Sequence, residues 1–201
     1  MSRIEVGSYQ TIKTFQYFTP SYREIIKEKD KSFYEYNLSE EDNFDFVINE
    51  YSGNDYWCLN NYLRDGSVKK YDEDDLKSWA WCLHSSLQYL RSNVPNGEEV
   101  YRGISRPAPN WRKGDCFYFG EFVSTSTDYG VAERFSDGNT LLVITITNNG
   151  NNGNNNYCRD ISNISKYKNE KEILITAFCR YKVTDYERGD PDIFYLDCIG
   201  Y

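Results

Sequence analysis

The sequence predicts an α+β fold in which an N-terminal helical layer packs on two β-sheets. Apolar residues recur at three- and four-residue steps up to about residue 95, and runs rich in β-branched and aromatic residues follow. The chain has 201 residues, of which 39% are hydrophobic, enough for one well-buried core. We therefore expect a single domain over 1–201, with a helical lobe over about 1–95 and a β-rich core over about 96–201.

The first half of the sequence carries the helical patterns. The stretch EDNFDFVINEYSGNDYWCLNNYLRDG divides at residues 52–53 into two amphipathic segments, and the second ends at an Asp-Gly pair typical of a helix C-cap. In DEDDLKSWAWCLHSSLQYLRSN, apolar residues form one stripe at helical spacing, and a Pro-Asn-Gly turn at 95–97 ends the segment. These helices are expected to cover the sheets.

The second half is strand-like. Five segments carry the pattern: EEVYRGI, CFYFGEFVSTST, TLLVITIT, EKEILITAFCRYKVTDY and DIFYLDCIGY. One short helix is expected among them, in DYGVAERFSD. The biased segment NNGNNGNNN, between Thr147 and Tyr157, is predicted to be a flexible loop tip without chemistry of its own.

Charge and composition exclude several partners. A net charge of −8 argues against a nucleic-acid backbone or an anionic membrane, and no apolar run approaches the roughly 20 residues of a membrane span. The start, MSRIEVGSYQTIK, lacks the apolar centre of a signal peptide, so we expect a cytoplasmic monomer, or a secreted one if a leader has been removed. The six cysteines include no C-x-x-C pair and are expected to be reduced, with disulfides open as the alternative in a secreted protein.

Several catalytic schemes are also excluded. The single histidine, His84, lies in the helix-patterned WAWCLHSSL and is predicted to be a packed residue, which removes most Ser-His-Asp, Cys-His and zincin sites. Neither glycine-rich phosphate-binding motif is present. The acidic YDEDDLK lacks the spacing of a calcium loop and favours a helix N-terminus, so no metal site is expected.

Two glutamates flank one lysine in EKEILI. If the segment is extended, Glu170 and Glu172 point to the same face and Lys171 to the opposite one. Two close carboxylates perturb each other's pKa values and suit acid/base chemistry or the stabilisation of a cation. The alternative is a solvated strand end.

Three motifs now stand in order along the chain: VYRGIS with Arg102, FVSTSTD with Ser124, and NEKEILI with Glu170 and Glu172. This order resembles the R-S-E class of arginine-specific mono-ADP-ribosyltransferases. YSGNDYWCLNNYLRDG is similar to a helix of that family, and CRDISNISKYKNEKEILI to its approach to the catalytic strand. The resemblance covers most of the chain. It implies transfer of ADP-ribose from NAD+ to an arginine of a target protein, with release of nicotinamide and without a metal.

The resemblance implies catalytic roles for four residues. Glu172 would stabilise the oxocarbenium ion that develops when the nicotinamide glycosidic bond breaks. Glu170 would hold or deprotonate the acceptor arginine, which needs a carboxylate because its pKa is about 12.5 or above. Arg102 would bind the pyrophosphate of NAD+ through its guanidinium fork, and Ser124 would steady Glu172 and the nicotinamide ribose.

Further positions are implied to bind NAD+ or the target. Gly103 would let the backbone approach the nicotinamide closely, and Thr125 and Ser126 would brace the local backbone. The other residues implied near NAD+ are Phe135, Asn60, Arg64 and Tyr56, and Tyr167 is implied in target recognition. The alternative for each is an ordinary turn, core or surface residue.

Two features depart from the family pattern. Gly138 stands where toxin members carry an arginine that contacts phosphate, and NNGNNGNNN replaces a short hairpin turn. Two alternatives to the transferase stay open: an NAD glycohydrolase, and an inactive module of the same fold that binds NAD+ or a protein. The intact motifs favour the active transferase.

Overall fold

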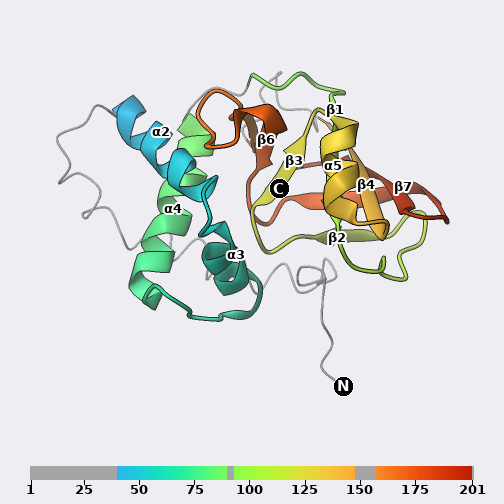
Figure 1. Ribbon diagram of the computed structural model, residues 1–201, viewed down its shortest axis with the longest axis horizontal. Helices are drawn as coiled ribbons and strands as arrows, with labels where there is room; N and C mark the ends of the chain where they lie inside the picture. Colours follow the sequence, from blue (N-terminus) through green and yellow to red (C-terminus); the bar gives the residue numbers. More distant parts are fainter. Residues whose placement is uncertain (1–39, 90–92, 148–156, 201) are drawn as a thin grey trace.

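The structure, a computed structural model, describes residues 40–89, 93–147 and 157–200. Helices α2 (Glu40–Tyr51), α3 (Tyr56–Asp65) and α4 (Glu73–Tyr89) form a layer beside the strands, and the short α5 (Tyr129–Ser136) lies over β1 and β4 (Figure 1). The two helices predicted on either side of residues 52–53 are confirmed, and α3 ends at Gly66 with the left-handed φ of 74° that a C-cap requires. The NNGNNGNNN segment lies outside the described residues.

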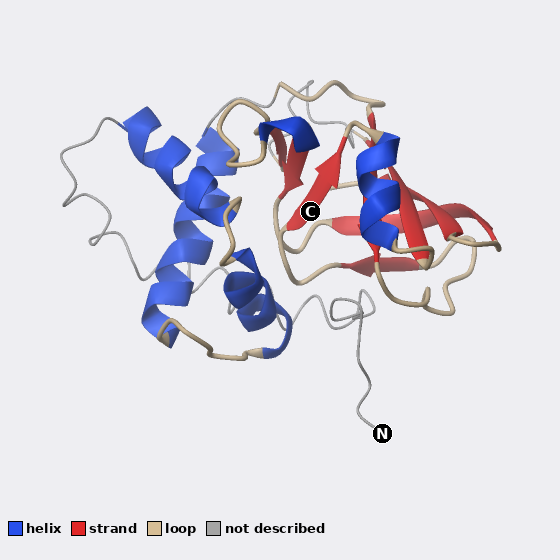
Figure 2. Ribbon diagram, in the orientation of Figure 1, coloured by secondary structure: helices blue, strands red, loops and turns tan. Residues whose placement is uncertain are grey.

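Within the described residues, eight strands make up the β part of the protein (Figure 2). They are β1 (Glu99–Ile104), β2 (Cys116–Tyr118), β3 (Val123–Ser126), β4 (Thr140–Ile146), β5 (Cys158–Asp160), β6 (Glu172–Ile175), β7 (Arg180–Glu187) and β8 (Asp192–Cys198). Their order in the ladder is β2-β7-β8-β4-β1-β3-β6-β5, and only the β4–β8 pair among them is parallel. Two of the predicted strand segments each contain two strands, and β5 was not predicted.

The ladder has two halves that meet at one point. Between β1 and β3 a single pair, Tyr101 with Ser126, is in register, whereas β1 and β4 pair along six residues. One core cluster contains side chains of both halves, including Val100 and Leu142 from one and Val123 and Ile173 from the other. The two halves therefore pack face to face across this core, and the predicted α+β class with a helical layer is confirmed.

Strand β6, which lies between β3 and β5, is buried on both faces. Ile173 and Ile175 of β6 belong to the core between the two halves, while Leu174 between them packs in a second core with helices α2, α3 and α4. A strand covered on both faces needs apolar side chains at every position, which explains the unbroken ILI of this segment. The two cores therefore bury the strand that begins at Glu172.

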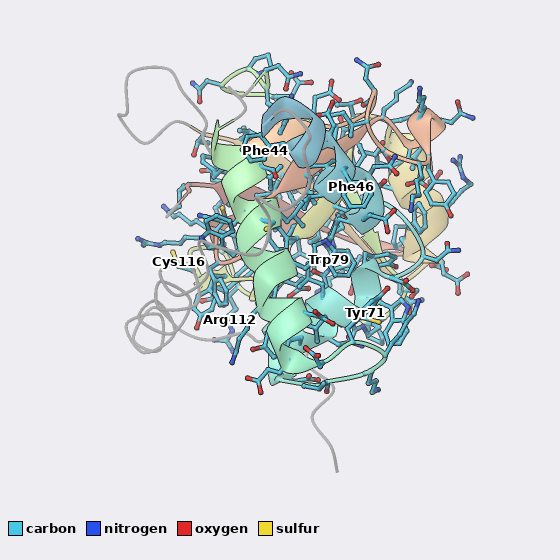
Figure 3. All side chains as sticks on the ribbon, turned by 90° about the vertical axis from the view of Figure 1, so that its left-hand side faces the viewer. Phe44, Phe46, Tyr71, Trp79, Arg112 and Cys116 are labelled. Atoms are coloured by element: carbon cyan, nitrogen blue, oxygen red, sulfur yellow. The ribbon has the colours of Figure 1, made fainter. Side chains whose placement is uncertain are left out.

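The helical layer is held by large apolar and aromatic contacts. Tyr71 and Trp79, which lie beside each other in Figure 3, meet edge to face at 5.8 Å. His84 of α4 is buried, and its Nδ1 lies 2.8 Å from Thr176 Oγ1. Burial lowers the pKa of His84 to about 4, so the ring is neutral at pH 7, as expected for a packed residue.

The structure also bears on membrane and metal binding. None of the helices in the described part of the chain is both long and apolar enough to cross a membrane. Across 40–89, 93–147 and 157–200, no cluster of three or more His, Cys, Asp and Glu side chains is placed to hold a metal ion. All six cysteines are free thiols, and five of them are buried.

Candidate functional site

A cavity of about 390 Å³ lies where α3, β1, β3, α5 and the loop before β6 come together. Eleven of the twelve residues predicted for the site line it: Tyr56, Asn60, Arg102, Gly103, Ser124, Thr125, Ser126, Phe135, Tyr167, Glu170 and Glu172. The twelfth, Arg64, does not. Residues separated by more than a hundred positions in the sequence thus meet in one cavity.

Strand pairing brings the serine motif to the glutamates. Strands β3 and β6 are antiparallel, with Ser126 opposite Glu172 and Ser124 opposite Leu174. Because side chains alternate along a strand, Ser124, Ser126 and Glu172 face the same side, toward the cavity. The position of Glu172 at the first residue of β6 therefore places its side chain on the same side of the sheet as the two serines.

Glu172 is nearly buried, with 6% of its surface exposed. Ser165 donates a hydrogen bond of 3.2 Å from Oγ to Glu172 Oε2. Burial raises the pKa of Glu172; hydrogen bonds from Ser124 and Ser165 oppose that rise, and the charge of Glu170 adds to it. The site thus holds a carboxylate with few water contacts, so its charge acts strongly on a neighbouring cation.

Ser124 is itself held by two residues of the helical layer. The hydroxyl of Tyr51 lies 3.5 Å from Ser124 Oγ, and Asn60 donates from Nδ2 to that hydroxyl at 3.0 Å. Asn60 also donates to the carbonyl of Phe122 at 3.3 Å. Tyr51 is fully buried, and it was not predicted, because a tyrosine in an apolar helical stripe carries no sign of a polar task.

The backbone around Glu170 differs from the prediction. Instead of an extended E-K-E, the structure has a 3-10 turn, η2 (Lys168–Glu170), then Lys171 with a left-handed φ of 47°, and only then the strand. The two glutamates therefore reach one cavity through a turn rather than by strand alternation. Burial raises the pKa of Glu170, and the positive charge of Arg134 opposes that rise.

Lys171 is more than a spacer between the glutamates. Its Nζ donates to Asp128 Oδ2 at 3.1 Å, and Asp128 caps α5 by accepting from the amide of Gly130 at 3.0 Å. The lysine thus ties the turn before β6 to the start of α5, and both border the cavity.

The other hydroxyls of the serine motif brace the backbone, as the resemblance implies. Thr125 donates from Oγ1 to the carbonyl of Ile173 at 2.6 Å. Ser126 donates from Oγ to the carbonyl of Glu170 at 2.6 Å and accepts from the amide of Asp128 at 2.9 Å. Ser126 therefore fixes the turn that carries Glu170.

Gly103 is required by a close approach of helix α5. A Cβ at Gly103 would lie 1.9 Å from the carbonyl oxygen of Ala132 and 2.3 Å from the amide nitrogen of Ser136. No larger residue fits between β1 and this helix. Gly103 also lines the cavity, and α5 carries Phe135, which is 57% exposed, to the edge of the same space.

Arg102 and Arg64 share one carboxylate that was not predicted. Glu121, only 1% exposed, has its Oε1 at 3.7 Å both from Arg102 Nη2 and from Arg64 Nη1. The Arg102 guanidinium also lies 5.6 Å from the centre of the Phe119 ring. The two arginines therefore meet although one comes from α3 and the other from β1.

The loop before β6 is fastened to the end of α2. Tyr167 donates from its hydroxyl to Asn54 Oδ1 at 2.9 Å, and the amide of Lys166 donates to Ser52 Oγ at 2.8 Å. Asn49 donates from Nδ2 to the carbonyl of Ile164 at 2.8 Å. These bonds make the wall that closes the cavity between the helices and the loop, and they place Tyr167, 47% exposed, at its rim.

Comparison with known proteins gives matches across most of the chain. The family model described as NAD:arginine ADP-ribosyltransferase matches residues 12–199. A Mycobacterium avium (strain 104) protein, Mav, named as a candidate NAD(+)–arginine ADP-ribosyltransferase, is 33% identical over 142 residues, which are 68% of this chain and 15% of Mav. NAD(P)(+)–arginine ADP-ribosyltransferase 2 of Gallus gallus is 30% identical over 117 residues, 58% of this chain and 34% of that protein. The chain thus spans well under two thirds of either relative.

Solved structures share the fold at low identity. Vis toxin, an ADP-ribosyltransferase from Vibrio splendidus, superposes with a TM-score of 0.62 at 19% identity, covering 94% of this chain and 87% of Vis. Exoenzyme S from Pseudomonas aeruginosa, solved with carba-NAD, superposes with a TM-score of 0.62 at 19% identity, covering 89% of this chain and 88% of exoenzyme S. A variant of the eukaryotic mono-ADP-ribosyltransferase ART2.2, solved with NADH, superposes with a TM-score of 0.59 at 20% identity. The match covers 92% of this chain and 75% of ART2.2. Together with the family match, these findings confirm the resemblance, and the chain belongs to the NAD:arginine ADP-ribosyltransferase family.

Proposed function

We propose that the protein transfers ADP-ribose from NAD+ to an arginine of a target protein and releases nicotinamide. The observation that carries this proposal is the meeting of Arg102, Ser124, Glu170 and Glu172 in one cavity, although they come from β1, β3, η2 and β6. A buried carboxylate beside a partly exposed one gives two acidic groups with separate environments, which suits two separate tasks.

In the first step the bond between the ribose C1′ and the nicotinamide nitrogen breaks, and its electron pair leaves with nicotinamide. The ribose is left as an oxocarbenium ion. Glu172 stabilises this cation by charge and is held in place by Ser124 and Ser165. Because Glu172 is shielded from water, its charge is weakly screened where the cation develops.

In the second step a nitrogen of the acceptor arginine forms the new bond to C1′. The guanidinium must lose a proton, and Glu170 at the partly exposed side of the cavity accepts it. When water replaces the arginine, the product is free ADP-ribose, so slow NAD+ hydrolysis is the expected side reaction. The target is a protein with an accessible arginine.

The most direct test of this function follows the fate of labelled NAD+. The protein is incubated with NAD+ labelled in the adenylate and with a cell lysate, and the modified side chain is mapped by mass spectrometry. We expect label on arginine together with free nicotinamide. Binding of NAD+ without any nicotinamide release would contradict the proposal and favour a binding module.

Replacement of Arg102 tests the proposed contact with the NAD+ pyrophosphate. We expect Arg102→Ala to weaken NAD+ binding about ten- to a hundred-fold, since charge-assisted hydrogen bonds contribute roughly 1.5–3 kcal/mol. Arg102→Lys should lose less, because it keeps the charge and gives up only the bidentate geometry. Calorimetry measures both affinities.

A matched control is Arg112→Ala, an exposed arginine outside the lining of the cavity (Figure 3). Its affinity for NAD+ should equal that of the unmodified protein. Unchanged affinity in both Arg102 variants would remove Arg102 from the NAD+ site.

A further inference from the structure

A second hollow, of about 490 Å³, adjoins the side of the cavity where Glu170 lies. It is lined by Arg134 of α5 and by residues of the loop before β6: Lys166, Tyr167, Lys168, Asn169 and Glu170. Tyr167 and Glu170 line both this hollow and the main cavity. A segment that brings an arginine to Glu170 therefore comes within reach of the residues that line the second hollow.

The charge of this hollow is opposite to that of the whole protein. Three cationic side chains, Arg134, Lys166 and Lys168, face one carboxylate there, whereas the chain carries a net charge of −8. Lys166 is paired with Glu50 at 2.9 Å. Arg134 and Lys168 form no ion pair with any residue that the structure describes. The two remain available to a partner.

This cationic lining creates a difficulty for the acceptor. An arginine that approaches Glu170 is itself a cation, and Arg134 and Lys168, which line the same hollow as Glu170, repel it. A carboxylate close to that arginine in the target would turn the repulsion into attraction. Complementary charge of this kind also raises the rate of encounter and penalises wrong partners.

We propose that the second hollow binds acidic residues next to the acceptor arginine, so that the targets of this protein carry their arginine in an acidic segment. The proposal rests on the proposed function, in which Glu170 receives the acceptor. Arg134 and Lys168 would pair with the acidic side chains, and the exposed ring of Tyr167 offers an apolar surface between the two hollows.

The test compares two peptides that differ only beside one arginine, with aspartate on both sides in the first and asparagine in the second. Agmatine, a guanidinium without flanking residues, is the reference acceptor. We expect kcat/KM for the aspartate peptide to exceed that of the asparagine peptide at least ten-fold at 50 mM salt and to approach it at 0.5 M. Arg134→Glu/Lys168→Glu should remove or reverse the preference.

The control variant is Lys182→Glu, a charge reversal at an exposed position of β7 outside both hollows; it should keep the preference. Equal kcat/KM for both peptides, or a preference that survives Arg134→Glu/Lys168→Glu, would overturn the acidic-segment proposal while leaving the transferase intact. Failure to modify agmatine and both peptides would overturn the proposed function and this inference together.

Glu121 carries a second, independent inference. One of its oxygens lies between the guanidinium groups of Arg64 and Arg102, and the other, Oε2, has no hydrogen-bond partner within the described residues. A carboxylate that is 1% exposed and incompletely bonded is costly unless it serves its neighbours. Two arginines that converge from α3 and β1 would otherwise repel each other.

We infer that Glu121 is a positioning residue, which holds Arg64 and Arg102 side by side so that Arg102, which lines the cavity, faces the pyrophosphate of NAD+. It does not touch the ligand, because it is buried and does not line the cavity. This inference also rests on the proposed function. It predicts that the charge of Glu121 matters for the affinity for NAD+ and little for the chemical step.

The experiment measures the Kd and KM for NAD+ and kcat for nicotinamide release in Glu121→Ala and Glu121→Gln. Glu121→Ala should weaken NAD+ binding about ten-fold and change kcat less than three-fold. Glu121→Gln, which keeps an oxygen acceptor, should recover part of the affinity for NAD+. Binding of nicotinamide alone, which has no phosphate, should not change. In an Arg64→Ala/Arg102→Ala background, Glu121→Gln should have no further effect on NAD+ affinity.

A fall in kcat without a change in affinity would overturn the positioning role, as would an equal effect of Glu121→Gln in both backgrounds. If the alanine variant does not fold, the glutamine variant and the background comparison still decide. An unmodified protein that binds no NAD+ would instead overturn the proposed function along with this inference.

Discussion

Glu172→Gln is expected to lower arginine modification and NAD+ hydrolysis together, by about 10² or more. In the proposed mechanism both reactions pass through the same oxocarbenium ion, and the amide keeps the shape of the side chain while removing the charge that would face the cation. The measurement is nicotinamide release beside arginine modification on the same samples. Substrate affinity should change little, since the effect falls on the transition state.

The control is Glu99→Gln, which removes a charge from an exposed position of β1 outside the cavity; both rates should stay as they are. In the proposed mechanism only ionised Glu172 can stabilise the cation, and its pKa is raised by burial. Activity should therefore begin to fall, as the pH is lowered, above the pH at which an exposed glutamate protonates. Hydrolysis that survives Glu172→Gln would show that another residue stabilises the cation.

The strands and the positions of the serine and threonine hydroxyls could be predicted, because the alternation of side chains along a strand depends on the local sequence. Side chains alternate between the two faces of the sheet in VSTS, and the apolar run ILI indicates a strand buried on both faces. Once β3 and β6 pair, these patterns determine which side chains lie on the same face. The C-cap at Gly66 follows from the same kind of local rule. For these elements the resemblance to the family adds only which face is the functional one.

The turn at Glu170 could not be predicted from alternation. A left-handed backbone at Lys171, a residue with a Cβ, has no local sequence signal, and tertiary bonds hold it. Those bonds are the contact of Lys171 with Asp128 and the hydrogen bond from Ser126 to the Glu170 carbonyl. A prediction based only on residue spacing within one segment cannot detect these contacts between distant segments.

Tyr51 and Glu121 were missed for a related reason. Each acts on a residue far away in the sequence, Tyr51 on Ser124 and Glu121 on Arg64 and Arg102. Neither a tyrosine in an apolar stripe nor a glutamate between a glycine and a phenylalanine points to such a partner. The signals in the sequence are the place of Tyr51 at the start of the family-like stretch YSGNDYWCLNNYLRDG and the position of Glu121 three residues before Ser124, in the apolar run FYFGEFV.

The last expected result separates the two glutamates. Glu170→Gln should nearly abolish transfer to arginine while NAD+ hydrolysis largely survives, because Glu172 would still stabilise the cation. The guanidinium must give a proton to a carboxylate before it attacks, whereas attack by water depends less on such a base. The structure favours this division. Glu172 is buried at the start of β6, and Glu170 lies on a turn at the boundary of the main cavity and the second hollow.

The assay uses agmatine as acceptor, so that any loss is independent of how the target protein docks. A matched variant is Glu133→Gln, which removes a charge from an exposed position of α5 next to Arg134; transfer should persist there. Equal loss of both reactions in Glu170→Gln would make Glu170 part of the NAD+ site and contradict its acceptor role. Retention of arginine transfer would instead mean that a group other than Glu170 takes the proton from the guanidinium.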